Sequence, residues 1–557
     1  MSNFSSFMRE DIFLEMEAYK QDILVIGGGI TGAGIALDSV TRGLKTTVLE
    51  MQDFAAGTSS RSTKLIHGGL RYLKQLEIKV VAEVGKERKI VYENGPHVTT
   101  PEWMMLPFYD GGTFGKYTTN LGLLLYDFLA GVKKTERRKM FSPREAMVKE
   151  PLIKRDGLKG AGYYVEYKTD DARLTIEVMK KAAELGAHSI NYAKVTEFIY
   201  KSDKVVGVVV EDQITGNLHK IYAKKIINAT GPWVDNLREM DKSKQGKSLH
   251  LTKGVHLVFP KEKFPLQQAI YFDAPDNRMI FAIPRGDKTY VGTTDTTYND
   301  EIASPKVKAE DYEYLIDTIN FMFPSLKIDL KDVESSWAGI RPLIAEDGKN
   351  PNEISRKDEI FISDSGLFSI AGGKLTGYRK MAEQVIDKVV KQFKEEDEIL
   401  HSDSNTRGLP ISGGEVGGSQ GFKNFKENKV EQGISLGLER KDSLNLVQRY
   451  GSNAEKVFNI YKEKADEAKQ QNVDPVVFAQ IVYGLEHEMV FKPADFFIRR
   501  TGALYFDISW VTKHFSSVIS YMGKKLNWSN NQQEEYTREL NALIKERKPT
   551  EVEKSMI

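Results

Sequence analysis

The stretch DILVIGGGITGAGIALDSVTRGLKTTVLE, residues 22–50, decides the class of the amino-terminal fold. It opens with the apolar run 23–26, which is typical of a strand buried inside a parallel sheet. Three glycines follow with the spacing G-x-G-x-x-G. Gly27 permits a tight turn, Gly29 lets the backbone approach a pyrophosphate, and Gly32 lets the next helix pack closely. The order of strand, glycine turn and helix predicts a dinucleotide-binding unit.

A helix and a second strand complete this unit. The helix, expected over about residues 32–42, directs the N–H groups of its first turn at the phosphates. The strand over residues 46–49 ends at Glu50, the position where such folds accept hydrogen bonds from a ribose diol. Because an acid at this position repels a 2′-phosphate, the pattern disfavours NADP and leaves FAD and NAD open.

Six further stretches occur in order along the chain, and each alone is consistent with an ordinary strand and turn. Together with the glycine motif they resemble the FAD-dependent glycerol-3-phosphate dehydrogenases, which belong to the D-amino-acid-oxidase-like flavoproteins. The resemblance covers about residues 20–400. It implies α/β and α+β architecture: an FAD-binding Rossmann-like domain interleaved with an antiparallel-sheet substrate domain, followed by a helical C-terminal domain. The stretches are GTSSRSTKLIHGGLRYL (57–73), TDDARL (169–174), NATGPWVD (228–235), GTTD (292–295), GIRPL (339–343) and GGKLTGYRK (372–380).

A second glycine-rich segment, ISGGEVGGSQG at residues 411–421, offers the remaining place for a nicotinamide site. No strand-like run precedes it, and its glycines break the spacing of the dinucleotide motif. We interpret it as a flexible linker. The sequence therefore favours FAD as the cofactor.

The composition of the 557 residues is that of an ordinary globular protein, with 40% hydrophobic and 28% charged residues. The net charge of +1 provides no global attraction for nucleic acid, so we expect none as a partner. The absence of cysteine excludes disulfides, iron–sulfur clusters and thiolate zinc sites. The segment LEHEM, residues 485–489, does not match H-E-x-x-H, and no metal is expected. The first twenty residues lack a secretory signal, and no apolar run is long enough to cross a membrane.

The expected organisation has one oxidoreductase unit and one helical domain. Because the chain passes back and forth between two sheets, the unit is discontinuous in sequence. The predicted boundaries are 17–400 for the FAD-dependent unit, with FAD parts at about 17–100, 150–245 and 345–400 and a substrate sheet mainly at 246–344, then a linker at 401–425 and a helical domain at 426–557.

The expected cofactor residues combine the glycine motif with the family resemblance. Small hydroxyl side chains in the segment 58–60 suit hydrogen bonds along a pyrophosphate and ribityl chain. A strand that ends at Gly231 lets the backbone approach a flat ring. Paired glycines before residue 374 start a helix whose N–H groups face an electron-rich carbonyl of reduced flavin. The predicted set is Gly27, Gly29, Gly32, Glu50, Thr58, Ser59, Ser60, Lys64, Leu65, Gly231, Gly373, Lys374, Leu375 and Thr376.

Arginines are the expected ligands of a substrate phosphate, because a guanidinium binds two oxygens at once. Arg341 and Arg356 match arginines that contact substrate in the resembled family, although an arginine is more often a solvated surface group. Pro342 restricts the backbone beside Arg341. The resemblance also places Arg71 and Tyr72 near the substrate.

Two histidines are candidates for the base that takes the proton of an alcohol during hydride transfer to flavin. His67 and His256 both lie in family motifs, but a histidine in an apolar strand is more often a buried core residue. The sequence does not decide between them. Lys374 is a candidate for balancing the charge of a flavin or substrate oxygen; its alternative is an exposed lysine at the start of a helix.

The resemblance implies oxidation of sn-glycerol 3-phosphate to dihydroxyacetone phosphate, with electrons passed to a membrane quinone. The alternative is the related oxidase, which uses oxygen and makes hydrogen peroxide, but too few residues lie between Leu343 and Gly372 for that branch's insertion. The same arginines could also clamp the carboxylate of an amino or hydroxy acid. We expect a cytoplasmic protein, peripherally bound to the inner face of the cell membrane, with a homodimer as the candidate assembly. Candidate membrane segments are 121–140 and 491–506, and both are also consistent with buried helices.

Overall fold

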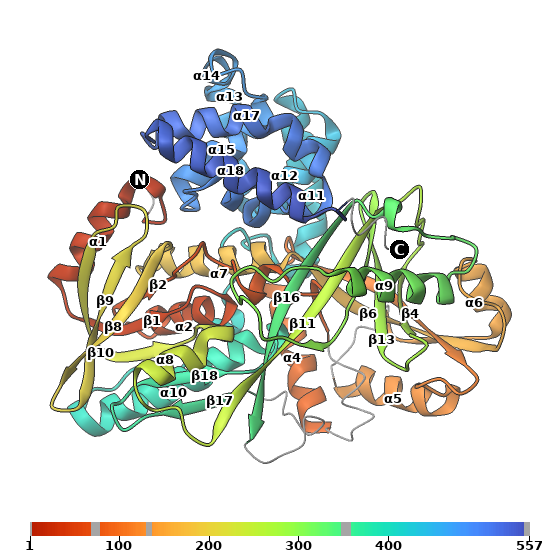
Figure 1. The fold of residues 1–557 in the computed structure, drawn as a ribbon, viewed down its shortest axis with the longest axis horizontal. Helices are drawn as coiled ribbons and strands as arrows, with labels where there is room; N and C mark the ends of the chain where they lie inside the picture. Colours follow the sequence, from red (N-terminus) through yellow and green to blue (C-terminus); the bar gives the residue numbers. More distant parts are fainter. Residues whose placement is uncertain (1–2, 68–77, 130–135, 347–357, 551–557) are drawn as a thin grey trace.

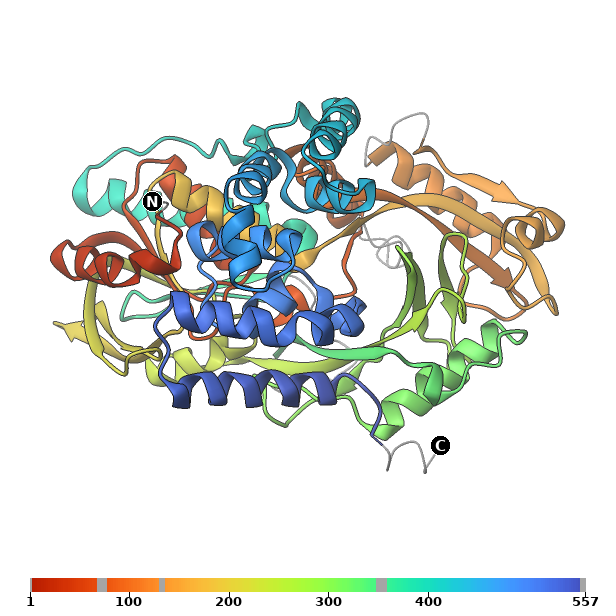
Figure 2. The same cartoon turned by 90° about the horizontal axis from the view of Figure 1, so that it is seen from above.

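The computed structural model describes residues 3–67, 78–129, 136–346 and 358–550, which form two sheets and a helical domain (Figure 1). Figures 1 and 2 show the helical domain lying against one side of the sheet-containing unit, and its core is continuous with residues of the second sheet. The predicted site residues Arg71, Tyr72 and Arg356 lie outside the described residues. The predicted architecture of two interleaved sheets and a C-terminal helical domain is confirmed.

The first sheet contains eight of the described strands and is built around the glycine motif. Its central strand, β1, pairs in parallel with β2 and β10, and all of its residues but Asp22 are buried. The order is β17-β18-β10-β1-β2-β7, and β8 and β9 extend β10 as the predicted antiparallel meander. The strands are β1 (Gln21–Ile26), β2 (Thr46–Leu49), β7 (His188–Ile190), β8 (Ala193–Lys201), β9 (Lys204–Asp212), β10 (Leu218–Asn228), β17 (Glu359–Ile362) and β18 (Phe368–Ala371).

Helices pack on this sheet as expected for a dinucleotide fold. The helix after the glycine motif, α2, begins directly after Gly29 and packs against both α7 and α10. Its sequence is rich in small and apolar residues, so that most of it is buried. The helices of the sheet-containing unit are α1 (Arg9–Ala18), α2 (Ile30–Thr41), α4 (Ile78–Asn94), α5 (Lys116–Leu129), α6 (Pro143–Lys149), α7 (Asp171–Glu184), α8 (Val234–Met240), α9 (Ala309–Met322) and α10 (Tyr378–Asp397).

The second sheet contains ten of the described strands in the order β15-β11-β14-β13-β12-β4-β6-β3, with β16 on β11 and β5 on β6. β11 and β16 are antiparallel along most of their length, from Lys247 opposite Glu346 to Val258 opposite Ser335. The strands are β3 (Leu65–Ile66), β4 (Thr99–Tyr109), β5 (Lys139–Phe141), β6 (Leu158–Thr169), β11 (Lys247–Pro260), β12 (Ala269–Asp273), β13 (Met279–Arg285), β14 (Lys288–Gly292), β15 (Thr296–Thr297) and β16 (Ser335–Glu346).

The assignment of residues 150–245 to the FAD portion needs a correction for one strand. β6 belongs to the second sheet, where it pairs with β4 from Thr99 opposite Thr169 onward. Because β6 is buried along nearly its whole length, its apolar pattern fits either sheet, and only its long-range pairing decides between them. The other predicted limits of the FAD parts and of the substrate sheet stay predictions.

The helical domain begins earlier than predicted, because the segment assigned as linker at 401–425 already contains the first turns of α11. The carboxylate of Glu93 caps this helix by accepting hydrogen bonds from the backbone N–H and hydroxyl of Ser419 at 2.9 and 2.7 Å. The glycine-rich part before it is packed: the N–H of Ile411 donates to the carbonyl of Asn94 at 3.0 Å. The flexible-linker interpretation is therefore wrong. Contacts this distant in sequence leave no local pattern.

Some helices of the C-terminal domain begin at a residue whose side chain caps them. Asp474 accepts from two backbone N–H groups of α15, and Ser529 and Gln532 form a capping box on α18, both at predicted helix boundaries. The elements are α11 (Gly418–Ser435), α12 (Arg440–Tyr450), α13 (Ala454–Glu463), α14 (Ala465–Gln470), α15 (Pro475–His487), the π-helical turn η10 (Asp495–Arg500), α16 (Ala503–Phe506), α17 (Ile508–Lys525) and α18 (Asn530–Glu546).

The two candidate membrane segments differ in exposure. Residues 491–506 form part of the core of the helical domain, with Phe496, Phe497 and Leu504 fully buried, so a membrane contact there is wrong. The helix α5 instead exposes Leu121 and Leu124, which are 68% and 50% exposed. Within the described residues, no helix has both the length and the apolar character needed to cross a bilayer.

Candidate active site

Two adjoining cavities lie where the two sheets meet. The smaller, of about 550 Å³, follows the glycine motif and the ends of β1 and β2. The larger, of about 840 Å³, lies over the second sheet. They share part of their walls, so a ligand in the smaller cavity reaches the larger one. The shared lining residues are Thr58, Ser62, Pro342, Gly373, Lys374 and Leu375.

The glycine motif forms a backbone cradle at the smaller cavity. Gly27 has φ +112°, and a Cβ there would lie 2.5 Å from the carbonyl oxygen of Ala229. A Cβ on Gly32 would lie 1.9 Å from the carbonyl oxygen of Gly27, so both positions require glycine. Gly29 precedes α2 and lines the cavity. This cradle of backbone beside a helix start fits the pyrophosphate of an extended dinucleotide.

Glu50 lies at the ribose end of the same cavity, with its carboxylate held by backbone donors. One oxygen accepts from the N–H of Gly28 at 2.7 Å and the other from the N–H of Gln52 at 2.7 Å. Burial nevertheless raises the pKa of Glu50 to about 7, since two neutral donors do not replace the lost hydration. A carboxylate fixed in this way has acceptor positions left for a ribose diol.

The hydroxyl segment 58–60 lies beside this cradle. Thr58 donates to the carbonyl of Ile340 at 2.7 Å, and its side chain borders both cavities. The hydroxyl of Ser59 accepts from the N–H of Ile30 at 2.9 Å and so caps α2. Ser60 is buried and does not line either cavity.

Two further predicted cofactor residues of this segment, Lys64 and Leu65, have different surroundings. Leu65 lines the larger cavity. Lys64 is buried behind the cavity walls, where its ammonium donates to Asp171 at 2.6 Å and to the carbonyl of Ser60 at 2.9 Å. The structure thus gives Lys64 a packing role within the protein.

Two glycine turns form the opposite wall. Gly231 has φ +57° and lines the smaller cavity, while Gly373 has φ +81° and borders both. Lys374 and Leu375 also border both cavities, at the start of the short helix η7 (Leu375–Gly377). Thr376 lines the larger cavity and donates to the carbonyl of His67 at 3.3 Å.

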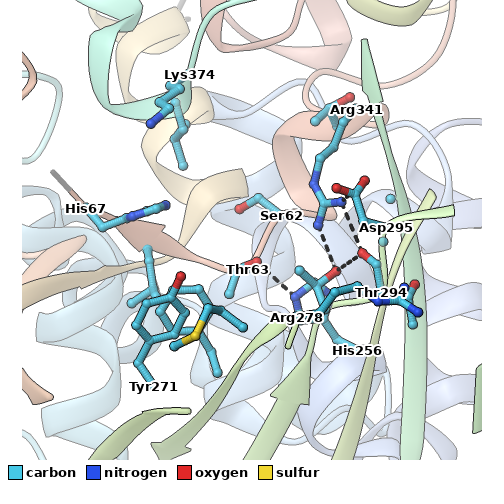
Figure 3. Close-up of a pocket in the computed structure, with 18 of the residues that line it drawn as sticks. Ser62, Thr63, His67, His256, Tyr271, Arg278, Thr294, Asp295, Arg341 and Lys374 are labelled. Atoms are coloured by element: carbon cyan, nitrogen blue, oxygen red, sulfur yellow. Dashed lines mark hydrogen bonds and ion pairs between the residues drawn. The ribbon is translucent and has the colours of Figure 1, made fainter. Parts of the chain in front are cut away.

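Arg341 enters the larger cavity from β16, and Figure 3 shows it beside Asp295. Its Nη1 donates to the carbonyl of Thr294 and to Oδ1 of Asp295, both at 3.1 Å. Its Nη2 donates to the hydroxyl of Thr293 at 2.8 Å. These contacts fix the plane of the guanidinium, while 31% of the side chain stays exposed toward the cavity. The arrangement suits an anionic group of a ligand.

The two candidate histidines have different surroundings. His256 on β11 is buried and stacks on Trp337, with ring centroids 4.7 Å apart and planes 10° apart. Burial, with the charges of Arg341 and Lys64, lowers its pKa well below the ordinary value, so the ring is neutral. His67 lies across the cavity from Arg341, near Lys374 (Figure 3).

Several residues at the site have no signal in the sequence. Thr63 contacts the Nε2 atom of His256, and Asp171 holds the segment that carries Thr63. Tyr271 and Phe281 stack 4.2 Å apart in the cavity wall. Threonine and aromatic residues in strands are common, so their type alone does not mark a site. Asp171 lies in the motif TDDARL and Asp295 in the motif GTTD, but neither residue has a predicted role.

Comparison with known proteins gives two family matches. Residues 22–378 match the family described as FAD dependent oxidoreductase, and residues 404–533 match the C-terminal domain of alpha-glycerophosphate oxidase. The aerobic glycerol-3-phosphate dehydrogenase of Bacillus subtilis (strain 168) is 59% identical over 541 residues, covering 97% of this chain and 98% of that protein. The protein of that name from Staphylococcus haemolyticus is 56% identical, covering 97% of each.

Solved structures agree with these matches. The glycerol-3-phosphate dehydrogenase from Bacillus halodurans, complexed with FAD, superimposes with a TM-score of 0.86 at 47% identity and covers 98% of each chain. The L-alpha-glycerophosphate oxidase from Mycoplasma pneumoniae shares the fold, with a TM-score of 0.54 at 16% identity over 70% of this chain. The chain belongs to the FAD-dependent oxidoreductase family, and FAD is the cofactor that its glycine cradle and Glu50 fit.

Proposed function

We propose that this enzyme oxidises sn-glycerol 3-phosphate to dihydroxyacetone phosphate and passes the electrons to a membrane quinone. The observation that carries the proposal is Arg341, whose guanidinium is fixed in a cavity adjoining the cofactor cleft. A fixed guanidinium binds a phosphate without first losing its own freedom. The relatives named aerobic glycerol-3-phosphate dehydrogenase support this substrate, since they are similar over nearly the whole chain.

In this proposal the phosphate lies at Arg341 and the alcohol carbon points toward the wall formed by Gly373 and Lys374. Arg356, predicted to bind the phosphate, and Arg71 and Tyr72, predicted to lie near the substrate, stay part of the proposal as implied by the family resemblance. FAD supplies the hydride acceptor where the two cavities adjoin. Lys374, at this junction, places a positive charge beside the oxygen on which negative charge develops.

We assign the base role to His67 in preference to His256. His67 is only partly buried and lines the cavity near Lys374, so its ring has access to a substrate hydroxyl. His256 is stacked against Trp337, and its lowered pKa makes it a weak proton acceptor. His256 also lines the cavity, but its ring is held between Trp337 and the hydroxyl of Thr63.

The substrate is tested by anaerobic reduction of the bound flavin. We expect glycerol 3-phosphate to bleach the flavin absorbance and glycerol, which lacks the phosphate, to leave it unchanged. Bleaching by an amino or hydroxy acid in place of glycerol 3-phosphate would assign the arginine to a carboxylate and would refute the proposed substrate.

The electron acceptor is tested by reoxidising the same reduced enzyme. We expect a soluble quinone analogue to restore the flavin absorbance faster than air does. Rapid reoxidation in air with stoichiometric hydrogen peroxide would instead favour the oxidase.

We also propose peripheral association with the inner face of the cell membrane, with the exposed Leu121 and Leu124 of α5 as a contact, and a homodimer as the candidate assembly. Binding to vesicles by the protein and by Leu121→Ser tests this contact.

A further inference from the structure

The helical domain contacts a loop of the cofactor cleft at a buried carboxylate, that of Asp53. Two consecutive arginines of η10 bind Asp53, in the loop that follows β2. Arg500 makes a two-pronged contact, with Nη1 2.7 Å from Oδ2 and Nη2 2.9 Å from Oδ1. The Nε of Arg499 also donates to Oδ2, and Asn191 donates to Oδ1 at 2.9 Å. Asp53 therefore has four side-chain donors.

This contact is deeply buried on both sides. The side chain of Asp53 is fully inaccessible to solvent, and that of Arg500 is 1% exposed. Because Arg500 and Arg499 are so near, they hold the pKa of Asp53 below its ordinary value even though burial alone raises it. Arg500 also donates from Nε and Nη2 to the carbonyl of Glu488, at 3.1 and 2.7 Å. Its guanidinium is thereby fixed from two directions.

Asp53 belongs to the same short loop as Glu50. Within it, the N–H of Gln52 donates to the Glu50 carboxylate at 2.7 Å, and the carbonyl of Gln52 accepts from the N–H of Tyr192 at 2.8 Å. The carbonyl of Glu50 accepts from the N–H of Ala193 at 2.7 Å. The loop is thus attached at Glu50, at Gln52 and at Asp53, and only the last attachment comes from the helical domain.

We propose that Arg500, assisted by Arg499, is a positioning residue of the FAD site. Through Asp53, the helical domain fixes the loop that presents the Glu50 carboxylate to the adenosine ribose. The family assignment accounts for FAD, and the glycine cradle accounts for its pyrophosphate. Neither explains why a separate domain directs two buried cations at the loop beside the ribose position.

The simpler interpretation is that these arginines only hold the two domains together. A second buried arginine at the same interface, Arg173, provides a matched control for Arg500. Arg173 of α7 forms an equally buried contact with Glu488, with Nη1 and Nη2 2.9 and 2.8 Å from its carboxylate oxygens. Arg173 joins the same two domains, but within the part of the chain that the structure describes it forms no hydrogen bond or ion pair with Asp53 or Glu50. Arg173→Met therefore loosens the interface and leaves the contact at Asp53 in place.

The test compares release of FAD from full-length holoenzyme on dilution, followed by flavin fluorescence, for Arg500→Met and Arg173→Met. We expect Arg500→Met to weaken FAD binding by about tenfold or more, the size typical when a supporting partner of a binding group is removed. Arg173→Met lowers the thermal midpoint but leaves the FAD affinity near that of the wild type. Equal weakening by both variants, or wild-type affinity in Arg500→Met, overturns the proposal.

A second measurement asks whether Arg500 acts through Glu50. In the Glu50→Gln background, we expect Arg500→Met to weaken FAD binding much less than in the wild type, because the group that it positions is already altered. Additive effects contradict the proposal. If Arg500→Met is not recovered folded, Arg500→Lys, which keeps a charge but loses the two-pronged contact, is carried through both comparisons with a smaller expected effect. Because the readout is FAD affinity, an error in the proposed substrate leaves the result unaffected.

Discussion

The Nε2 atom of His256 lies 3.0 Å from the hydroxyl oxygen of Thr63. This contact joins the second sheet to the segment that borders both cavities, and Figure 3 shows it at the cavity wall. The two neighbours of Thr63 are both bound to Asp171. The carboxylate of Asp171 accepts hydrogen bonds from the N–H and hydroxyl of Ser62 at 3.0 and 2.7 Å. It also accepts one from the ammonium of Lys64 at 2.6 Å. The motif TDDARL therefore acts on the site through this segment.

Thr63→Val tests whether this hydrogen bond matters for catalysis or only for folding. The variant keeps the shape and leaves the buried imidazole nitrogen unsatisfied, which costs about 1–3 kcal/mol. We expect a lower thermal midpoint together with slower flavin reduction, because the segment that carries Thr63 lines the larger cavity and loses a contact that fixes it.

The control for this variant is Thr289→Val. Thr289 is also buried in the second sheet and donates to the carbonyl of Phe264 at 2.7 Å, but it does not line either cavity. We expect it to lose stability with an unchanged rate of flavin reduction. If the two variants lose stability equally and both keep the wild-type rate, the Thr63 contact is a packing feature alone.

The parts of the fold that could be predicted are those that depend on residues close together along the chain. The glycine spacing predicts β1, α2 and β2 because the steric demand at Gly32 comes from the same unit, where a Cβ would lie 1.9 Å from the carbonyl oxygen of Gly27. Helix caps at Asp474 and Ser529 are equally local. By contrast, the start of α11 depends on the distant carboxylate of Glu93, and nothing near residue 418 indicates it.

The site residues also divide into those that the sequence could predict and those that it could not. Arg341 could be selected because its motif and residue type suit a phosphate, and the structure places it in the larger cavity. Lys64 has the same charge in an equally suggestive motif, yet its ammonium is used in a buried ion pair with Asp171. Residue type and position in a motif do not show which way a side chain points. That direction depends on a partner distant in the sequence.

Arg341→Ala is expected to weaken substrate binding and turnover together. Its guanidinium is fixed by Thr293, Thr294 and Asp295, so it binds the phosphate and also holds the alcohol carbon in position for hydride transfer. Loss of such a charge contact, once the bound substrate excludes water from it, costs about 2–5 kcal/mol, measured as kcat/KM for glycerol 3-phosphate. Unchanged kinetics would remove Arg341 from the substrate site.

Arg278→Ala is the control for the charge at the cavity. Arg278 also lines the larger cavity, but its side chain is 44% exposed and pairs with Asp276 at 2.6 Å. An exposed ion pair of this kind contributes about 0–1 kcal/mol. We expect a change in kcat/KM within that range. A loss as large as that of Arg341→Ala would show that general positive charge, and not the fixed guanidinium, attracts the substrate.

His67→Asn is expected to slow flavin reduction by about 10²–10⁴-fold, the usual effect of removing a general base, while substrate binding changes little. Single-turnover reduction under anaerobic conditions measures this step directly. His256→Asn provides the comparison: we expect it chiefly to destabilise the protein, because it disrupts the stack on Trp337. If His256→Asn abolishes reduction while His67→Asn reduces at the wild-type rate, the assignment of the base is reversed.

Glu50→Gln is expected to change the pH dependence of stability in the FAD-free protein. Burial raises the pKa of Glu50 from an ordinary 4.5 to about 7. Between these values the folded protein binds a proton that the unfolded chain has lost, so the free energy of unfolding falls as pH rises through this window. Above about pH 7 the wild type carries the full free-energy cost of an ionised, buried carboxylate at residue 50. The neutral glutamine does not carry this cost.

Glutamine has one oxygen for the two N–H groups of Gly28 and Gln52, so the variant loses one hydrogen bond at every pH. We therefore expect the stability of FAD-free Glu50→Gln, relative to the wild type, to rise by about 1–3 kcal/mol between pH 5 and pH 8. Thermal midpoints measured across this range check the prediction. With FAD bound, the wild type is the more stable of the two, because the carboxylate accepts hydrogen bonds from the ribose more strongly than an amide does. Parallel curves for the two FAD-free proteins would show that the Glu50 carboxylate is ionised at little cost, and its raised pKa would be wrong.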